Sequence, residues 1–411
     1  MICQCSRAVR LTTLICKLRH ERRVAGIVVA LLIVAAVGQG PVVGAEGRSP
    51  EFVKGYSWGW VGRRGDYASA EAADSMKRLA EAGANSVCIA FATEMRTAQT
   101  PEFGWADQNR RMVSDDEIRR AIELAGENGM KVILKPVINC RDRTWRAWIK
   151  FYRPVTAEER ARGVTGTLDP WQDDPVTLEG MVVDDRQWTV WWERYTAFIL
   201  HYARIAEEKD VEILCLGCEM SSTEAFDDRW RALIADVREV YHGALTYDVN
   251  HGREDQVSWW DAVDVVSISA YYPVPPPEGT SLEDAVKQTT PVAEIVAELE
   301  KIKAELAAFS ARWKKPILFI ETGVVNVRGC ARYPWSQPRD PRLHPTDELE
   351  QANYYQAMFE VFYDEPWFLG FAWWDWPARL YDADDAARRR NFCAYRKQAE
   401  QVLRQWYAKR R

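Results

Sequence analysis

The sequence predicts a (β/α)8 barrel, or TIM barrel, that forms a single domain with long loops, and two observations support this fold class. From residue 51 onward, short runs rich in Val and Ile alternate with longer stretches whose apolar residues have helical spacing. This alternation indicates a parallel sheet covered by helices. Eight apolar runs occur without a dividing linker, which matches the strands of a barrel. An open doubly wound sheet is the alternative, but the glycine-rich phosphate loop that such sheets often carry is missing.

The expected strands are short apolar segments bounded by polar or turn-forming residues. In chain order they are residues 55–60, 85–92, 131–138, 211–219, 244–250, 265–273, 316–322 and 370–376. All parallel strands of a barrel end at the same face, so the residues that end these segments are expected to lie close together.

Helices are expected between the strands, and several have recognisable ends. Gly83 follows the first helix, and glycine is a common stop at a helix C-terminus. Ser114 and Glu117 form a capping box ahead of the second helix, which Gly129 closes. The expected helices are residues 69–82, 114–129, 187–209, 227–241, 292–313, 346–363 and 391–406.

Two connections are longer than ordinary loops. Residues 139–186 follow the third expected strand, and residues 323–345 follow the seventh. Both segments follow strands, so in a barrel they project over the active-site face. Their aromatic residues include Trp145, Trp148, Tyr152, Trp171 and Trp335.

The first 45 residues have the three parts of a secretory signal peptide. Basic residues precede an apolar run at 24–37, and small residues at 43–45 precede a cleavage position ahead of Glu46. The apolar run is shorter than the roughly 20 residues of a spanning helix, although an uncleaved anchor is the alternative. We therefore expect an exported protein, periplasmic or extracellular, whose catalytic domain comprises residues 46–411.

The composition favours carbohydrate as the partner and argues against nucleic acid. The net charge is −6, whereas phosphate binding needs a basic face. The 19 Trp and 16 Tyr residues offer flat apolar faces with polar edges, on which sugars pack well. The five His and nine Cys residues show no metal-binding spacing. We expect a monomer that uses neither a metal nor another cofactor.

Glu219 and Glu321 are the strongest candidates for catalysis. Each ends an apolar strand, at Leu-Cys-Leu-Gly-Cys-Glu and Ile-Leu-Phe-Ile-Glu respectively. A lone buried carboxylate costs several kcal/mol unless it is paired or neutral, so its position needs a reason. The structural alternative is an ion pair with an Arg of a neighbouring loop. Two carboxylates across a cavity are the minimal equipment of a glycosidase, in which one protonates the leaving oxygen and the other attacks the anomeric carbon or activates water.

Several segments resemble one glycosidase family when their order and spacing are taken together. These are residues 55–60, 83–87, 216–219, 245–250, 269–273, 316–323 and 370–376. Over roughly residues 52–380 the chain resembles glycoside hydrolase family 113, whose known members are mainly β-mannanases. A Glu at the end of the fourth strand and another at the end of the seventh is the layout of the retaining clan that contains this family.

The resemblance implies a role for each candidate. Glu219 is expected to be the acid/base and Glu321 the nucleophile, which Tyr271 or Tyr272 holds ionised through a hydrogen bond. Packing at the barrel mouth is the alternative for either Tyr, and a solvated loop position is the alternative for His251.

The other expected sugar contacts lie at the ends of strands. They are Trp58, Trp60, Asn250, His251, Trp373, Trp374 and Trp376, and strand alternation makes at least one of the last three a core residue. Further candidates, of which one or two are expected to reach substrate, are Glu94, Arg96, Asp248 and Asp375.

Two departures from the resemblance concern the substrate. Cys218 stands where the clan usually has the Asn that holds the sugar 2-hydroxyl, and no aromatic residue lies near Gly323. The expected function is nevertheless a retaining glycoside hydrolase acting on a β-linked polysaccharide or oligosaccharide, with β-mannan as the substrate that the resemblance indicates. A non-catalytic glycan-binding barrel and a transglycosylase are the alternatives.

Overall fold

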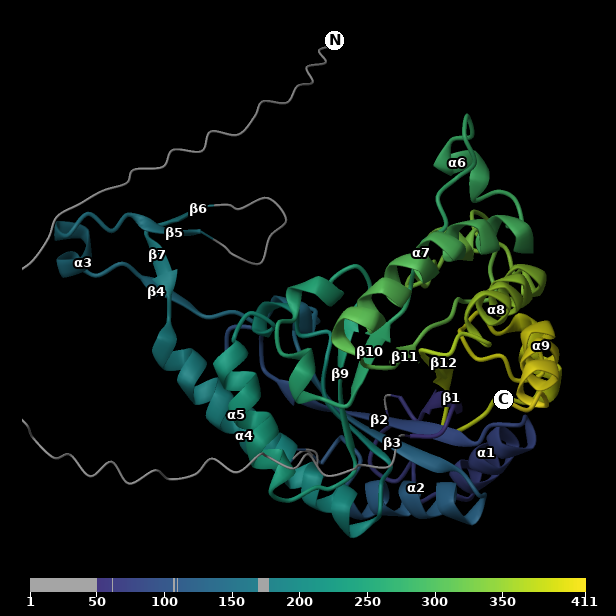
Figure 1. Ribbon diagram of the computed structural model, residues 1–411, viewed down its shortest axis with the longest axis horizontal. Helices are drawn as coiled ribbons and strands as arrows, with labels where there is room; N and C mark the ends of the chain where they lie inside the picture. The colour runs from purple at the N-terminus through teal and green to yellow at the C-terminus, as the bar shows by residue number, and fades with distance from the viewer. Residues whose placement is uncertain (1–49, 61, 106–107, 109, 169–176) are drawn as a thin grey trace, which may run out of the picture. The chain divides into compact units, whose positions relative to one another are not determined.

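The computed structural model describes residues 50–60, 62–105, 108, 110–168 and 177–411. Within this part, eight parallel strands close into a barrel in the order β1-β12-β11-β10-β9-β8-β3-β2 (Figure 1). They are β1 (Val53–Trp58), β2 (Ser86–Met95), β3 (Lys131–Cys140), β8 (Ile213–Cys218), β9 (Ala244–Asn250), β10 (Val265–Ser269), β11 (Ile317–Glu321) and β12 (Phe368–Trp376). The predicted (β/α)8 barrel and its eight strands are confirmed.

One strand end differs from the expectation. β10 ends at Ser269 rather than at residue 273. There the backbone turns, because the Tyr271 N–H donates to the Ser269 carbonyl at 3.0 Å and the Ala270 N–H donates to the Glu321 carbonyl at 2.7 Å. This turn brings the ring of Tyr271 towards the mouth of the barrel.

The long helices surround the barrel strands in Figure 1. They are α1 (Ala70–Glu81), α2 (Asp115–Glu127), α4 (Asp185–Glu208), α5 (Asp227–Arg238), α7 (Val292–Trp313), α8 (Glu348–Phe362) and α9 (Gln398–Tyr407). The capping box is present at α2, where the Ser114 and Glu117 side chains each accept from the other residue's backbone N–H. Shorter helices are α3 (Ala157–Ala161) and α6 (Leu282–Ala285).

The last helix begins later than expected, at Gln398 instead of residue 391. Arg396 has a φ of 60°, in the left-handed region, which an α-helix cannot accommodate. The Lys397 ammonium also donates to the Asn391 side chain at 2.6 Å and to the Asn326 side chain at 3.1 Å. These contacts hold residues 391–397 as turns against the neighbouring loop.

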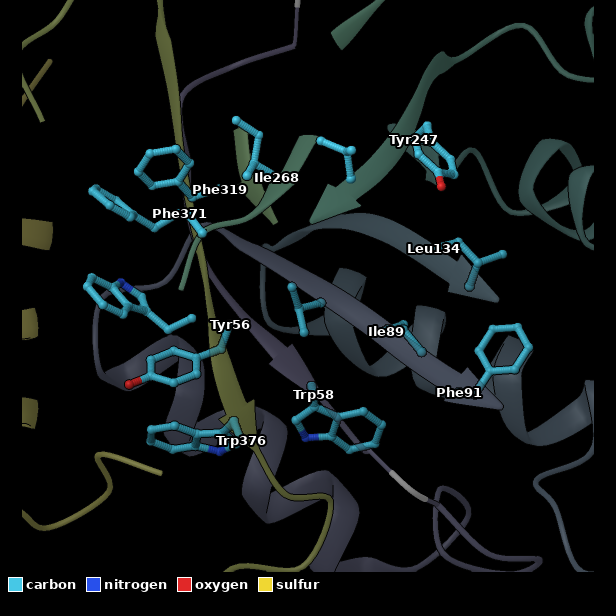
Figure 2. Close-up of a cluster of buried hydrophobic side chains, with 14 of the residues drawn as sticks. Tyr56, Trp58, Ile89, Phe91, Leu134, Tyr247, Ile268, Phe319, Phe371 and Trp376 are labelled. Carbon is cyan, nitrogen blue, oxygen red and sulfur yellow. The ribbon is translucent and has the colours of Figure 1, made fainter. Parts of the chain in front are cut away.

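Strand alternation divides the apolar side chains into two layers. An inner cluster fills the barrel and includes Cys88, Ile133, Cys215 and Leu318. A larger outer cluster packs between strands and helices, as the rings of Phe91, Phe319 and Phe371 show in Figure 2. Above the inner cluster, the inward positions of β3, β9 and β10 carry polar residues, namely Lys135, Thr246, Asp248, Ser267 and Ser269, all buried.

The segment after β3 contains secondary structure that the sequence did not predict. Short antiparallel pairs form between β4 (Tyr152–Pro154) and β7 (Met181–Val183), and between β5 (Gly166–Leu168) and β6 (Thr177–Glu179). Figure 1 shows these strands and α3 together beyond the ends of α4 and α5. Before them, a single 3-10 turn at Arg146–Trp148 lies beside the barrel mouth.

The expected leader, residues 1–45, lies outside the described residues. Among the residues that are described, no helix is long and apolar enough to cross a membrane. The six described cysteines are buried and unpaired.

Candidate active site

A cavity of about 600 Å³ opens at the carboxyl ends of the barrel strands. Strand ends, the 3-10 turn after β3 and the loop after β11 all contribute to it. Its lining residues are Trp60, Trp145, Arg146, Glu219, Asn250, His251, Tyr271, Glu321, Trp335, Trp374 and Phe392. Both predicted catalytic glutamates therefore face one cavity.

Glu219 follows the last residue of β8 and adopts an unusual backbone conformation. Its φ is 52°, a region that non-glycine residues seldom enter, and its N–H donates to the Asp248 carbonyl of β9 at 2.8 Å. Backbone strain of this kind persists only where the surroundings enforce it, and it concentrates at functional sites. The conformation carries the Glu219 carboxylate into the cavity.

The Glu219 carboxylate is held by Arg146 of the 3-10 turn and by Trp145, which immediately precedes the turn. The Arg146 guanidinium donates to Oε2, and the Trp145 indole N–H donates to the same oxygen at 3.2 Å. The ion pair that the sequence left open as an alternative is thus present at Glu219. Arg146 is itself anchored to the Asn139 side chain at 3.1 Å and to the Ile138 carbonyl at 3.2 Å.

Glu219 has the properties of a group that can carry a proton near neutral pH. Burial raises the pKa of Glu219 to about 7, although the Arg146 cation opposes this shift, and the nearby Glu321 charge adds to it. A carboxyl group with a pKa in this range can act as a general acid and then as a general base.

Glu321 ends β11 and is held differently. Oε2 accepts a hydrogen bond from the Tyr271 hydroxyl at 3.2 Å. Oε1 lies 2.5 Å from the Lys135 ammonium, and the Cys218 thiol donates to the same oxygen at 3.7 Å. Each oxygen of the Glu321 carboxylate therefore has a donor.

Lys135 is a site residue that we did not expect from the sequence. It lies on β3 at the same inward register as Ile133, and its side chain is completely buried. Its ammonium also lies 2.5 Å from Asp248 Oδ2. Burial alone would lower the pKa of Lys135, but the Asp248 and Glu321 charges outweigh burial and raise that pKa well above its ordinary value.

Cys218, Asp248 and Glu321 offer ligand atoms within 4.8 Å of one another, a spacing that suits a cation. The positive charge at this place is the Lys135 ammonium, in contact with both carboxylates. We therefore interpret the three residues as partners of Lys135 and not as metal ligands.

Other predicted contacts also reach the cavity. Trp60 and Trp374 face each other edge to face, with ring centroids 5.2 Å apart. Asn250 donates to the Ser221 hydroxyl at 3.2 Å. The His251 ring stacks on Trp335 at 5.7 Å and is not a solvated loop residue.

Three predicted sugar contacts are wrong, because the residues belong to the core. Trp58, Trp373 and Trp376 are all fully buried, and Figure 2 shows Trp58 and Trp376 on the helix side of the strands. The indole N–H groups of Trp58 and Trp376 donate to the Ser75 hydroxyl and carbonyl at 3.1 and 3.2 Å. Trp373 stacks on Tyr355 of α8 with centroids 3.8 Å apart.

Tyr272 also points away from the cavity, since its hydroxyl donates to Glu254 at 2.8 Å and its ring packs against Phe319. The structure thus selects Tyr271 as the partner of Glu321. Among the further candidates, Asp248 lies behind Glu321, and Glu94 accepts from Arg141 at 3.2 Å. Neither these two nor Arg96 and Asp375 line the cavity.

Comparisons with known proteins agree with the barrel fold. The family model described as Glycoside Hydrolase Family 113 matches residues 56–164 and 171–397. A family 113 β-mannanase from Alicyclobacillus acidocaldarius is 33% identical, with a TM-score of 0.69 over 88% of this chain and 98% of that chain. A second solved structure, a family 113 β-1,4-mannanase, is also 33% identical, with a TM-score of 0.70 over 88% and 100% of the two chains. No curated protein matches the chain.

Proposed function

The chain belongs to glycoside hydrolase family 113, and we propose that it cleaves β-mannan by a double displacement in which Glu321 is the nucleophile and Glu219 the acid/base. The observation that carries this proposal is the unequal environment of the two glutamates in one cavity. Glu321 accepts from three donors, whereas burial raises the pKa of Glu219 to about 7. Paired carboxyl groups whose surroundings separate their proton affinities divide the roles of anion and acid.

In the first step, Glu321 attacks the anomeric carbon and the glycosidic C–O bond breaks. Glu219 gives its proton to the departing oxygen, which leaves a glycosyl-enzyme ester on Glu321. In the second step, a water molecule attacks the same carbon, and Glu219 takes a proton from that water as the ester bond breaks. Glu321 returns as a carboxylate and Glu219 returns as an acid, so the cycle closes without a cofactor.

Mannan is the substrate class that the relatives support, because both 33% identical structures are described as β-mannanases. The cavity has aromatic faces for sugar rings, including Trp145 and Trp335, which are 44% and 49% exposed. Cys218 points to Glu321 and cannot replace the amide that the resemblance places there. Asn250 lines the same cavity, and we propose it as the donor to a sugar hydroxyl.

The test is reducing-sugar release by the purified protein on mannan, glucomannan, xylan, β-glucan and chitosan. Glu219→Ala and Glu321→Ala are compared with Glu94→Ala, whose carboxylate pairs with Arg141 outside the cavity lining. Activity on mannan that both site variants lose by several orders of magnitude, and Glu94→Ala keeps, supports the proposal. Activity that survives Glu321→Ala would show that Glu321 is not the nucleophile. Binding to a polymer without cleavage of any polymer would indicate a glycan-binding barrel.

Azide rescue distinguishes the two roles with an activated aryl β-mannoside. In Glu321→Ala, azide replaces the nucleophile and the product is the α-mannosyl azide. In Glu219→Ala, azide attacks the glycosyl-enzyme and the product is the β-mannosyl azide. The opposite assignment exchanges the two anomers. With the wild-type protein, products longer than the substrate indicate that the sugar is transferred to another sugar and not to water.

We also propose that residues 1–45 direct export and are removed ahead of Glu46. The proposal rests on the basic, apolar and small-residue order of this segment. Mass spectrometry of the protein from the periplasmic and extracellular fractions tests it, since an intact N-terminus in a membrane pellet indicates an anchor.

A further inference from the structure

The residues behind Glu321 form a closed set of buried charges. Lys135 and Asp248 have no exposed side-chain surface, and the Glu321 side chain is 9% exposed. An unpaired ammonium in such a place is costly, and the two carboxylates that contact Lys135 supply its counter-ions. Asp248 is fixed in turn by the Ser269 hydroxyl, which lies 3.0 Å from Oδ1.

We propose that Lys135 is a positioning residue for the nucleophile, and that it anchors Oε1 of Glu321 so that Oε2 is the oxygen that attacks. This inference rests on the proposed role of Glu321. Oε1 is held from the barrel interior by Lys135 and Cys218, which are both buried. Oε2 accepts only from Tyr271 among the contacts of the described residues, and Tyr271 lines the cavity. The oxygen on the cavity side is therefore the one that can reach a sugar.

The Lys135–Asp248 pair also explains how the site tolerates the loss of the Glu321 charge. When Oε2 bonds to the anomeric carbon, the carboxylate becomes a neutral ester. Lys135 then keeps Asp248 as its counter-ion, at 2.5 Å, so no unpaired buried cation arises. When water releases the sugar, the ammonium is already in place to stabilise the returning carboxylate.

The charged and titratable groups around Glu321 come from every side of the site. They are Cys88 of β2, Lys135 of β3, Arg146 of the 3-10 turn, Cys218 and Glu219 after β8, Asp248 of β9, Tyr271 after β10 and Asp375 of β12. Lys135 is the cation among them that contacts Glu321 directly. Its removal therefore takes away the positive charge that lies against Glu321.

The experiment is the pH profile of kcat/KM on soluble mannan for Lys135→Met, with Lys131→Met as the matched control. Lys131 begins the same strand, but its side chain is 54% exposed and pairs with Glu212 at 3.5 Å. We expect kcat/KM of Lys135→Met at neutral pH to fall roughly tenfold to a hundredfold, the usual effect of a lost hydrogen bond to a charged group. We also expect the acidic limb of this profile to move to higher pH, because the variant lacks the cation that contacts Glu321.

An acidic limb of Lys135→Met that coincides with that of the wild type overturns the inference, whatever happens to the rate. If Lys135→Met does not fold, Lys135→Gln, which also removes the positive charge but keeps an N–H donor to both carboxylates, is read in its place. The acidic limb of this second variant should also move to higher pH, and an unchanged limb would likewise overturn the inference. Full activity of Glu321→Ala would instead refute the proposed function, so the two failures are distinct.

Discussion

Arg146 and Glu219 lie 73 residues apart in the sequence, yet the guanidinium of the first donates to the carboxylate of the second inside the cavity. The pair joins the long segment after β3 to the end of β8. A cation in hydrogen-bond contact with Glu219 favours its ionised form, whereas general acid catalysis needs the protonated form. The balance between burial and Arg146 therefore sets the pH at which Glu219 can donate its proton.

We predict that Arg146→Met moves the alkaline limb of kcat/KM to higher pH by about one unit. Burial raises the pKa of Glu219 to about 7 against the opposing effect of Arg146. Without the cation this pKa rises further, so the acid form persists to higher pH. The measurement is the pH profile on mannan, with Arg141→Met as control because Arg141 pairs with Glu94 and is 57% exposed. A limb that stays in place or moves down would show that Arg146 does not govern this proton.

Tyr271 and Tyr272 form a matched pair of neighbouring residues with different partners. Tyr271 donates to Glu321 and Tyr272 donates to Glu254. We predict that Tyr271→Phe lowers kcat by roughly tenfold to a hundredfold, because it removes one hydrogen bond to a charged oxygen. Tyr272→Phe should keep kcat near the wild-type value. Equal losses in both variants would point to a packing effect at the barrel mouth, and initial rates at saturating mannan decide between the two results.

The barrel could be predicted from the sequence because its signals are local. Apolar runs such as Ile317–Glu321 are recognisable without knowledge of their neighbours, and strand ends meet at one face in any barrel. For the same reason, Glu219 and Glu321 could be identified as residues that end apolar strands. Lys135 gave a comparable signal, a charge within an otherwise apolar strand, but its partners lie 113 and 186 residues away.

The predictions for Trp58, Trp373 and Trp376 were wrong about the direction of the side chain and not about the strand that carries it. Trp373 and Trp374 are adjacent, and alternation requires them to face opposite sides, but the sequence does not say which one faces the cavity. The structure places Trp374 there and packs Trp373 on Tyr355. The contact between Arg146 and Glu219 was equally out of reach, because it depends on the path of a long segment with no strong periodic pattern.

We predict that substitution of Trp335 impairs substrate binding, whereas substitution of Trp373 impairs stability. Trp373 is fully buried, so Trp373→Ala removes a large core side chain and should cost about 3–5 kcal/mol of unfolding free energy. Trp335 is 49% exposed at the cavity, so Trp335→Ala should raise KM for mannan and leave Tm almost unchanged. Thermal unfolding and steady-state kinetics on both variants test this. A lower Tm for Trp335→Ala with an unchanged KM would mean that its stack on His251 has only a structural role.

Gly323 provides a test of how tightly the end of β11, which carries Glu321, is held. It lies two residues after Glu321, has a φ of +144°, and a Cβ there would lie 2.8 Å from the Trp374 carbonyl oxygen. The Trp374 N–H donates to the Thr322 carbonyl at 2.7 Å, so this clash separates the ends of β11 and β12.

Gly323→Ala should therefore lower both Tm and kcat, because moving the two strand ends apart also moves the Glu321 carboxylate and the ring of Trp374. Gly65→Ala is the matched control, since Gly65 also has a positive φ, +94°, but its Cβ would meet nothing within 4 Å. It should show only the backbone cost of roughly 1–2 kcal/mol and keep its kcat. If the two variants lose stability equally and Gly323→Ala retains full kcat, the ends of β11 and β12 can separate without disturbing Glu321.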